Sequence, residues 1–363
     1  MAETKAVDIL IVGTGDFAAR QLFDIAATAE RPVVVGVAGR NTDRLAWLKT
    51  AAQARASIYA KPVTVVTRTL GLERVDDIAE TIAMLSPKVV VQTASLQGSS
   101  VIGTSDDGWA RLIAAAGYGL TTVFQTLLSS RVAQATARAG IDAAFINCCY
   151  PDVVNRLLAA KQLPVLCGVG NIGILSSAFA GAALGGDERR LKLIAHYSVI
   201  GTWRLPRQDR LGPIPRVWID DAEIDNVIDR FAEVQLTAKP VIDISGATGV
   251  PLMLAIAGGY KWFGHVPGPE GRIGGYPVTV DGRALRLRLP PGLSESDAVA
   301  WNENFEARDG IQIDARGHVS YAGRLAQSLT IASPSLAEGF HVEDLEDVYS
   351  EMATLSAHLS GQP

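Results

Sequence analysis

The residues with the clearest chemical meaning form a glycine turn near the amino end of the chain. An apolar run, Val7–Val12, leads directly into Gly13-Thr14-Gly15-Asp16-Phe17-Ala18, and a helical pattern follows. The first glycine permits a tight turn, the second leaves room for a pyrophosphate, and Ala18 lets the helix pack closely on the strand. Free N–H groups at the start of such a helix attract phosphate oxygens. The order of strand, turn and helix therefore predicts that residues 13–18 bind a dinucleotide.

A second group of polar residues follows the next apolar run, Val33–Ala38. It consists of Gly39, Arg40 and Asn41, with Arg44 about one turn further along. Sites that prefer NAD carry an acidic residue at this point, where it binds the ribose hydroxyls, whereas a cation suits a 2′-phosphate. We therefore expect these residues to bind the cofactor and the cofactor to be NADP. The alternative, that Arg40 is a solvated loop residue, stays open.

Polar residues also follow two later apolar runs. Lys88–Thr93 continues into Ala94 and Ser95, and Asp142–Asn147 continues into Cys148-Cys149-Tyr150-Pro151-Asp152. Apolar runs that alternate with helical patterns are typical of a parallel sheet with helices on both faces. Ligands of such sheets bind at the carboxyl ends of the strands. We therefore expect Thr93, Ala94 and Ser95 to bind the cofactor, and the segment after Asn147 to lie in the same crevice.

The composition of the chain excludes several classes of protein. The chain has 363 residues, enough for two domains, of which 48% are hydrophobic and 20% charged, as in soluble globular proteins. Its net charge of −5, without a block of lysines and arginines, argues against nucleic-acid binding. No apolar run approaches the roughly 20 residues that cross a bilayer, and the amino end has no secretory signal pattern. We therefore expect a cytoplasmic protein that binds neither nucleic acid nor membranes.

The pattern of strands and helices changes near residue 151. We expect an α/β protein with a Rossmann doubly wound parallel sheet over residues 1–150, which binds NAD(P), and an α+β domain over residues 151–363 for substrate binding and oligomerisation. In the second domain we expect strands at Val165–Gly170, Leu191–Ile200 and Arg216–Asp220. We expect helices at Ile224–Leu236 and Gly249–Phe263, with Lys261–His265 at a helix end. We expect hairpins with turns at Asp281-Gly282 and Arg316-Gly317.

Read in order, the second half of the chain resembles the lactate/malate dehydrogenase superfamily. Phe145–Asn147 followed by Pro151-Asp152 is similar to that family's strand ending in Asn-Pro-x-Asp, and Val165–Ile172 is similar to its V-I-G-x-G-T-x-L stretch. Ser245–Thr248 resembles its K-G-A-T helix, and Gly275–Arg283 resembles its C-terminal hairpin. The resemblance implies a lactate/malate dehydrogenase-like second domain. A looser likeness leads to the NAD-dependent family-4 glycosidases, which share this fold.

The resemblance does not extend to that family's catalytic residues. It places the family's aspartate and substrate-binding arginine at Ile174 and Ser177. It places the family's catalytic histidine, which follows a strand, in the segment Ile200–Arg204, where Trp203 cannot exchange a proton. The resemblance therefore implies the fold without the usual 2-hydroxy-acid chemistry.

Four other residues are candidates for catalysis, because hydride transfer needs a group that donates or accepts a proton. His196 is expected on a strand and is the candidate acid/base, although a core histidine would give the same pattern. Asn147 matches the family's asparagine near the nicotinamide and the substrate. Tyr150 and Asp152 could relay a proton, and Asp152 could instead cap the following helix.

Cysteines and a metal site are weaker possibilities. Cys148 and Cys149 could be reactive thiols or small buried residues. We assign no metal ligands, although Cys167, Asn171 and His196 fall near the places where family-4 glycosidases bind manganese. A cluster after Trp203 could bind an anionic substrate or form a solvated face; it consists of Arg204, Arg207 and Arg210.

Together these observations predict an NADP-dependent oxidoreductase that reduces a C=O or C=N bond of a small molecule, or catalyses the reverse. We expect a homo-oligomer, either a dimer or a tetramer. Two alternatives remain: an NAD(P)-dependent lyase or glycosidase that oxidises its substrate transiently, and a nucleotide-binding protein without catalytic activity.

Overall fold

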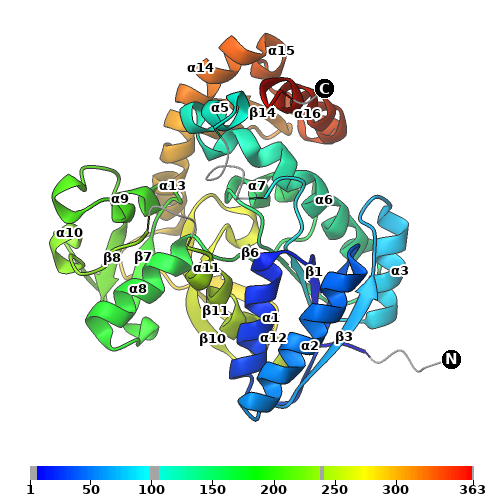
Figure 1. Cartoon of the computed structure of the whole chain (residues 1–363). Coiled ribbons are helices and arrows are strands. Elements are labelled where there is room, and N and C mark those ends of the chain that lie inside the picture. Colours follow the sequence, from blue (N-terminus) through cyan, green and yellow to red (C-terminus); the bar gives the residue numbers. More distant parts are fainter. Residues whose placement is uncertain (1–5, 99–105, 238–240, 362–363) are drawn as a thin grey trace.

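The computed structural model of the chain, which describes residues 6–98, 106–237 and 241–361, is built around a six-stranded parallel sheet (Figure 1). The strand order is β3-β2-β1-β4-β5-β6, and all neighbours are parallel. This order reverses between β1 and β4, the point at which doubly wound sheets bind ligands. The expected Rossmann sheet is confirmed. Its strands are β1 (Ile9–Val12), β2 (Val33–Gly39), β3 (Val63–Thr69), β4 (Val89–Gln92), β5 (Ala144–Asn147) and β6 (Cys167–Gly168).

Helices cover both faces of this sheet, because alternate residues of each strand point to opposite faces. Ile9 and Ile11 of β1 belong to a core that includes residues of α1 and α2, whereas Leu10 and Val12 belong to a core with residues of α3 and α6. The bounds of these helices are α1 (Asp16–Thr28), α2 (Thr42–Ile58), α3 (Val75–Leu85) and α6 (Thr122–Arg138).

The second half of the chain combines small antiparallel sheets with helices, as expected. β6 lies beyond residue 150 and completes the parallel sheet, and the division into two domains at that residue stays a prediction. The antiparallel strands are β7 (Leu191–Ile194), β8 (Arg216–Ile219), β9 (Ala222–Glu223), β10 (Trp262–Pro267), β11 (Gly275–Asp281), β12 (Ala284–Leu287), β13 (Ile311–Ile313), β14 (His318–Tyr321) and β15 (Phe340–His341). The helices include α7 (Val153–Ala160), α8 (Ile172–Leu184), α9 (Val199–Arg204), α10 (Val227–Arg230), α11 (Ile242–Thr248), α12 (Val250–Gly258) and α13 (Glu295–Asp309).

The strand predicted at Leu191–Ile200 is too long. β7 ends at Ile194, and α9 begins at Val199, so His196 lies in the turn between them rather than on a strand. The apolar pattern continued because Val199, Ile200 and Trp203 of α9 are themselves buried. A short apolar run does not distinguish a strand from a buried helix.

Two predicted helices are also wrong in length. Only α10 is helical within Ile224–Leu236. The helix predicted at Gly249–Phe263 ends before Gly259, which has a φ of +65° and closes the helix in the left-handed region. Lys261–His265 is therefore not a helix end, since β10 begins at Trp262.

The carboxyl-terminal helices form a separate core with α5 (Gly108–Ala116) and α6, which lies beside them in Figure 1. Trp109 and Phe124 meet Leu325 and Met352 there. These helices are α14 (Gly323–Ala332), α15 (Pro334–Ala337) and α16 (Leu345–Leu359). None of the helices in the described ranges is long and apolar enough to cross a membrane.

Candidate functional site

The turn between β1 and α1 contains two glycines, Gly13 and Gly15, which differ in their backbone conformation and in the space around them. Gly13 has a φ of +126°, and a Cβ there would lie 2.2 Å from Thr93 Oγ1, so the fold itself requires glycine. Gly15 has an ordinary φ of −72°, and no described atom lies within 4 Å of the place of its Cβ. No side chain in the described ranges caps α1 at Gly15. The space beside Gly15 is therefore open, and no described side chain caps the N–H groups of the first turn.

Two arginines lie at or near this turn. Arg44 Nε donates to the carbonyl oxygen of Thr14 at 3.1 Å, and its Nη2 bonds Asp16 Oδ1 at 3.0 Å, so its charge balances that of Asp16. Arg40 Nη1 is 3.6 Å from Glu73 Oε1, and its side chain is 75% exposed. An exposed pair at this distance is weak, so Arg40 is the arginine more easily drawn to a ligand.

The other predicted cofactor residues surround the same turn. Asn41 caps α2, since its Oδ1 accepts from the N–H of Arg44 at 2.8 Å. Thr93 follows β4 and its hydroxyl donates to the carbonyl of Val12 at 2.8 Å, which places it against Gly13. Ser95 donates to the carbonyl of Gln97 at 2.9 Å. The sheet therefore brings the ends of β1 and β4 together at one edge.

Asn147, at the end of β5, is fully hydrogen-bonded inside the protein. Its Nδ2 donates to Asn155 Oδ1 at 2.8 Å and to the carbonyl of Cys149 at 3.2 Å. Its Oδ1 accepts from Ser129 Oγ at 3.1 Å and from the N–H of Cys149 at 3.2 Å. These bonds connect β5 to α6 and α7, and a contact between Asn147 and a ligand stays a prediction.

The hydroxyl of Tyr150 makes no hydrogen bond to another catalytic candidate among the described residues. The ring of Tyr150 packs edge-on against Tyr118, with 6.0 Å between ring centroids, and its buried hydroxyl has no hydrogen-bond partner among the described residues. Burial raises the pKa of Tyr150, and Tyr118 and Cys149 are the titratable neighbours that add to this shift. Its role in proton relay stays a prediction.

His196, in contrast, is held between an acidic and a hydroxyl side chain. Its ring is 2% exposed, Nε2 lies 2.9 Å from Glu306 Oε1, and Nδ1 lies 2.9 Å from Ser198 Oγ. The backbone N–H of Ser198 also points at Nδ1, at 3.4 Å. A nitrogen that accepts from a backbone N–H carries a lone pair, so the proton of the neutral ring is on Nε2 and is donated to Glu306.

Glu306 is suited to hold that proton in place. The residue is 3% exposed, and its second oxygen, Oε2, accepts from the N–H of Ile311 at 2.7 Å. Both oxygens of this carboxylate are thus satisfied. The arrangement leaves His196 Nδ1 as a base whose neighbour, Ser198, is exposed.

Asp152 lies near this pair. Its Oδ1 accepts from Asn171 Nδ2, whereas its Oδ2 is buried and has no hydrogen-bond partner in the described part of the chain. Burial raises the pKa of Asp152 from 3.8 to about 6; Asn171 and His196 act against this shift, and Glu306 adds to it. Asp152 is the N-cap residue before α7, yet its side chain makes no capping bond, so the capping alternative is wrong.

The sequence did not identify Glu306, Asn171 and Ser198 as partners in this site. Glu306 comes from α13 and is separated from His196 by 110 positions, with no motif around it. Asn171 precedes α8 and was considered only as a metal ligand. Ser198 carried a local signal, since a hydroxyl two residues after a histidine can reach its ring.

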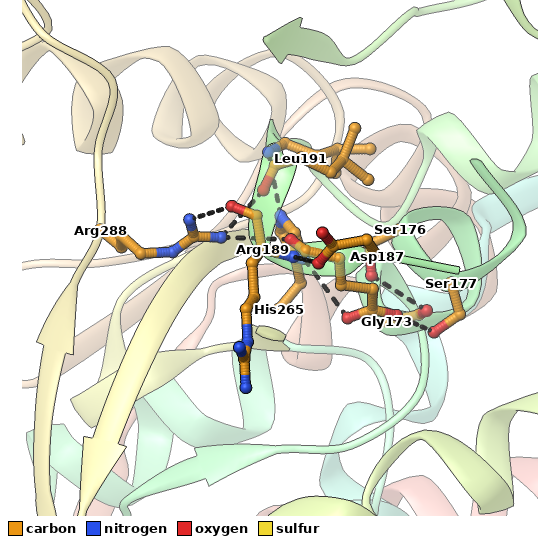
Figure 2. Close-up of polar contacts among 10 residues, drawn as sticks. Gly173, Ser176, Ser177, Asp187, Arg189, Leu191, His265 and Arg288 are labelled. Atoms are coloured by element: carbon orange, nitrogen blue, oxygen red, sulfur yellow. Dashed lines mark hydrogen bonds and ion pairs between the residues drawn. The ribbon is translucent and has the colours of Figure 1, made fainter. Parts of the chain in front are cut away.

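A second buried histidine, His265 on β10, lies in the polar cluster of Figure 2. The N–H of Leu193 donates to its Nε2 at 3.0 Å, and its Nδ1 is 3.9 Å from Glu188 Oε2. Glu188 also accepts from Ser177 Oγ at 2.5 Å. Burial lowers the pKa of His265, although the carboxylate of Glu188 opposes this shift. This histidine therefore stays neutral.

The remaining candidates are mostly structural. Burial raises the pKa of Cys149 to about 11, and it also raises the pKa of Cys148 and Cys167, which disfavours the reactive thiolate. Arg210 is 2% exposed and donates to the carbonyls of Leu205 and Val234, so for this arginine both the substrate-binding and the solvated alternatives are wrong. In the described ranges, no three or more His, Cys, Asp or Glu side chains group as a metal would require.

Comparison of the sequence with protein-family models and with curated proteins finds no match. Solved structures do match. Lactate dehydrogenase from Cryptosporidium parvum, complexed with lactic acid and β-nicotinamide adenine dinucleotide, is 14% identical over the whole of both chains, with a TM-score of 0.51. Malate dehydrogenase from the same organism is 12% identical over 83% of this chain and 96% of its own, with a TM-score of 0.54. The chain therefore has the fold of lactate and malate dehydrogenases.

Proposed function

We propose that this protein is an NADP-dependent oxidoreductase that reduces a C=O or C=N bond of a small molecule, or catalyses the reverse. The observation that carries the proposal is the space beside Gly15. The fold requires glycine at Gly13 but not at Gly15, and a pyrophosphate lying against the backbone supplies the missing reason. The lactate dehydrogenase that shares the fold is complexed with a dinucleotide, which supports this assignment.

Residues of the described turn fit such a cofactor. Gly13–Ala18 and the first turn of α1 would hold the pyrophosphate, and Thr93, Ala94 and Ser95 would border it at the end of β4. Gly39 ends β2 and is followed by Arg40 and Asn41, at the place where the adenosine ribose lies in this fold. Arg40 would leave its weak contact with Glu73 and bind the 2′-phosphate, which favours NADP over NAD. The bound nicotinamide supplies the hydride chemistry.

The pair of His196 and Glu306 would exchange the proton. When a substrate hydroxyl is oxidised, Nδ1 of His196 accepts its proton, either directly or through Ser198 Oγ. Glu306, which holds Nε2, stabilises the imidazolium that results. His196 lies two residues beyond β7 and shortly before Ile200–Arg204, the segment in which the sequence resemblance places the family's catalytic histidine. Trp203, which the sequence placed there, is buried in α9.

Self-association is a further part of the proposal. The outer face of α2 carries Trp47 and Ile58, which are 57% and 75% exposed, with Ala51 and Ala54 between them. Residues spaced in this way lie on one side of a helix. An apolar stripe of this kind supports the expected homo-oligomer, and sedimentation of Trp47→Glu against the unchanged protein tests it.

Titration with NADPH and with NADH tests the cofactor assignment. Gly15→Ala adds a Cβ to open space, so we expect unchanged thermal stability but at least about tenfold weaker binding of both cofactors. Gly181→Ala is a matched control, since its Cβ also meets no described atom and it lies on α8. Arg40→Asp should narrow the gap between NADPH and NADH. Equal affinities in the unchanged protein would refute the NADP preference, and no binding at all would refute the proposal.

A further inference from the structure

Asp152 has a buried carboxylate oxygen that no group in the described structure satisfies. The residue is 5% exposed, Oδ1 accepts from Asn171, and Oδ2 has no hydrogen-bond partner among residues 6–98, 106–237 and 241–361. Buried polar atoms are nearly always hydrogen-bonded, and an exception requires an explanation. Asp152 lies five residues beyond the carboxyl end of β5, at the edge where such sheets bind ligands. A ligand that donates a hydrogen bond would satisfy Oδ2.

The charges around this oxygen indicate what kind of ligand it accepts. Asp152 and Glu306 are both buried carboxylates; His196 is hydrogen-bonded to Glu306 and interacts electrostatically with Asp152. No lysine or arginine in the described ranges donates a hydrogen bond to either carboxylate. A carboxylate on the substrate would therefore meet two negative charges with a single imidazole to balance them.

The position that would hold an anion is also occupied. The sequence resemblance places a substrate-binding arginine at Ser177, and Ser177 instead donates to Glu188 in the cluster of Figure 2. The guanidinium of Arg288, which the same figure shows, donates to the carbonyls of Arg189 and Leu191. Ser177 is thus bonded to a side-chain carboxylate, and Arg288 holds the backbone at Arg189 and Leu191.

We propose that the substrate carries an amino group beside the reacting carbon, and that its ammonium donates to Asp152 Oδ2. The proposal rests on the oxidoreductase function above. For an amino alcohol, the carbon-bound hydrogen leaves as hydride to NADP⁺, and the hydroxyl proton goes to His196 Nδ1. The products are an amino ketone, NADPH and a proton. The reverse reaction takes up the same three species.

A matched pair of small probes tests the charge preference. 1-Amino-2-propanol and lactate have the same carbon skeleton and the same hydroxyl group. The first carries an aminomethyl group, protonated to an ammonium, where lactate carries a carboxylate. With NADP⁺ present, we expect kcat/KM for the amine to exceed that for lactate at least about tenfold, read as NADPH formation. Calorimetry of each probe with the protein–NADP⁺ complex measures binding independently of turnover. A preference for lactate, or binding of neither probe, would overturn the proposal.

Two variants connect the preference to Asp152. Asp152→Asn keeps the shape and an acceptor for Asn171 but removes the charge, so it should reduce amine binding at least about tenfold and leave NADPH binding unchanged. Asp225→Asn is the control, because Asp225 is exposed and lies outside the site. An amine preference that survives in Asp152→Asn would refute the role of Asp152. If the protein without substitutions does not bind NADPH at all, the proposed function is refuted instead.

Discussion

Two buried histidines, each beside a glutamate and near a serine, have different surroundings. His265 accepts a hydrogen bond from the backbone of β7 through one ring nitrogen, and its other nitrogen faces Glu188 at 3.9 Å (Figure 2). His196 donates to Glu306 at 2.9 Å, and its other nitrogen meets Ser198, an exposed residue. Both nitrogens of His265 therefore face the protein interior, whereas Nδ1 of His196 faces the hydroxyl of an exposed residue.

The comparison shows that burial beside a carboxylate does not by itself identify a functional histidine. The two histidines differ in the group that the second ring nitrogen faces: the carboxylate of Glu188 for His265 and the hydroxyl of an exposed serine for His196. His265 joins β10 to β7, so its loss should affect the fold. In the proposed function, Nδ1 of His196 exchanges a proton with the substrate, so its loss should affect turnover.

The largest effect is expected from His196→Gln. The glutamine amide can still donate to Glu306, so the buried carboxylate keeps a partner and the fold is retained. Loss of the general base should reduce kcat by about 10²–10⁴-fold, measured as NADPH formation with 1-amino-2-propanol. NADPH binding and the melting temperature serve as controls and should stay near the values of the unchanged protein. Unaltered turnover would remove His196 from the mechanism.

The reciprocal variant, His265→Ala, should act on stability. It leaves the N–H of Leu193 and the carboxylate of Glu188 without the imidazole, and it opens a cavity in a fully buried position. We expect the free energy of unfolding to fall by about 2–4 kcal/mol in urea, with kcat of the folded protein unchanged. His265→Asn offers a shorter acceptor to Leu193 and should recover part of the loss. A fall in kcat without a loss of stability would contradict the structural role.

Asp152→Asn is expected to change the free energy of unfolding by a smaller amount and in the opposite direction, as a gain in stability. Because burial raises the pKa of Asp152 from 3.8 to about 6, the folded state binds its proton more tightly than the unfolded state. The stability of the unchanged protein should therefore decrease as the pH rises from about 4 to about 6, and the charged group should lower stability above that range. Asp152→Asn should therefore be more stable than the unchanged protein by about 1–3 kcal/mol at pH 8. The gain should vanish near pH 4. Urea unfolding measured between pH 4 and pH 8 tests both expectations.

His265 gives the pH dependence an internal comparison. Burial lowers its pKa below the usual 6.5, so the unfolded state binds that proton more tightly and stability is lost as the pH falls below about 6.5. The two buried groups therefore bias stability in opposite directions over neighbouring pH ranges. A variant Asp152→Asn that is less stable than the unchanged protein at pH 8 would contradict the assigned cost of the buried carboxylate.

The sequence predicted the parallel sheet well because its signals are local. Valine and isoleucine runs define β1 and β4, Gly13 needs its positive φ, and Asn41 caps α2 through the bond that its type favours. Each of these signals depends on residues only a few positions apart in the sequence. The hairpins at Gly282 and Gly317 were found for the same reason.

The candidate site was predicted only in part because its contacts are distant in sequence. His196 and Asp152 were identified by type and position, but Glu306 reaches His196 across 110 positions, and its helix has no distinguishing motif. Tyr150, only two residues from Asp152, turns instead toward Tyr118. Spacing along the chain gave the residues near the sheet edge, whereas the position of α13 in the folded chain brings Glu306 to His196.

The smallest effect, and the sharpest test of what separates the two histidines, is expected from Ser198→Ala. The variant removes the hydroxyl at 2.9 Å from His196 Nδ1 but keeps the backbone N–H at 3.4 Å, so the ring stays oriented by Glu306 and by the main chain. If Ser198 Oγ passes the proton, kcat should fall about three- to tenfold, and Ser198→Thr, which retains a hydroxyl, should restore it. Equal kcat in Ser198→Ala and in the unchanged protein would show that the proton passes directly between substrate and Nδ1. The accessible hydroxyl would then mark the open side of His196 without taking part in the transfer.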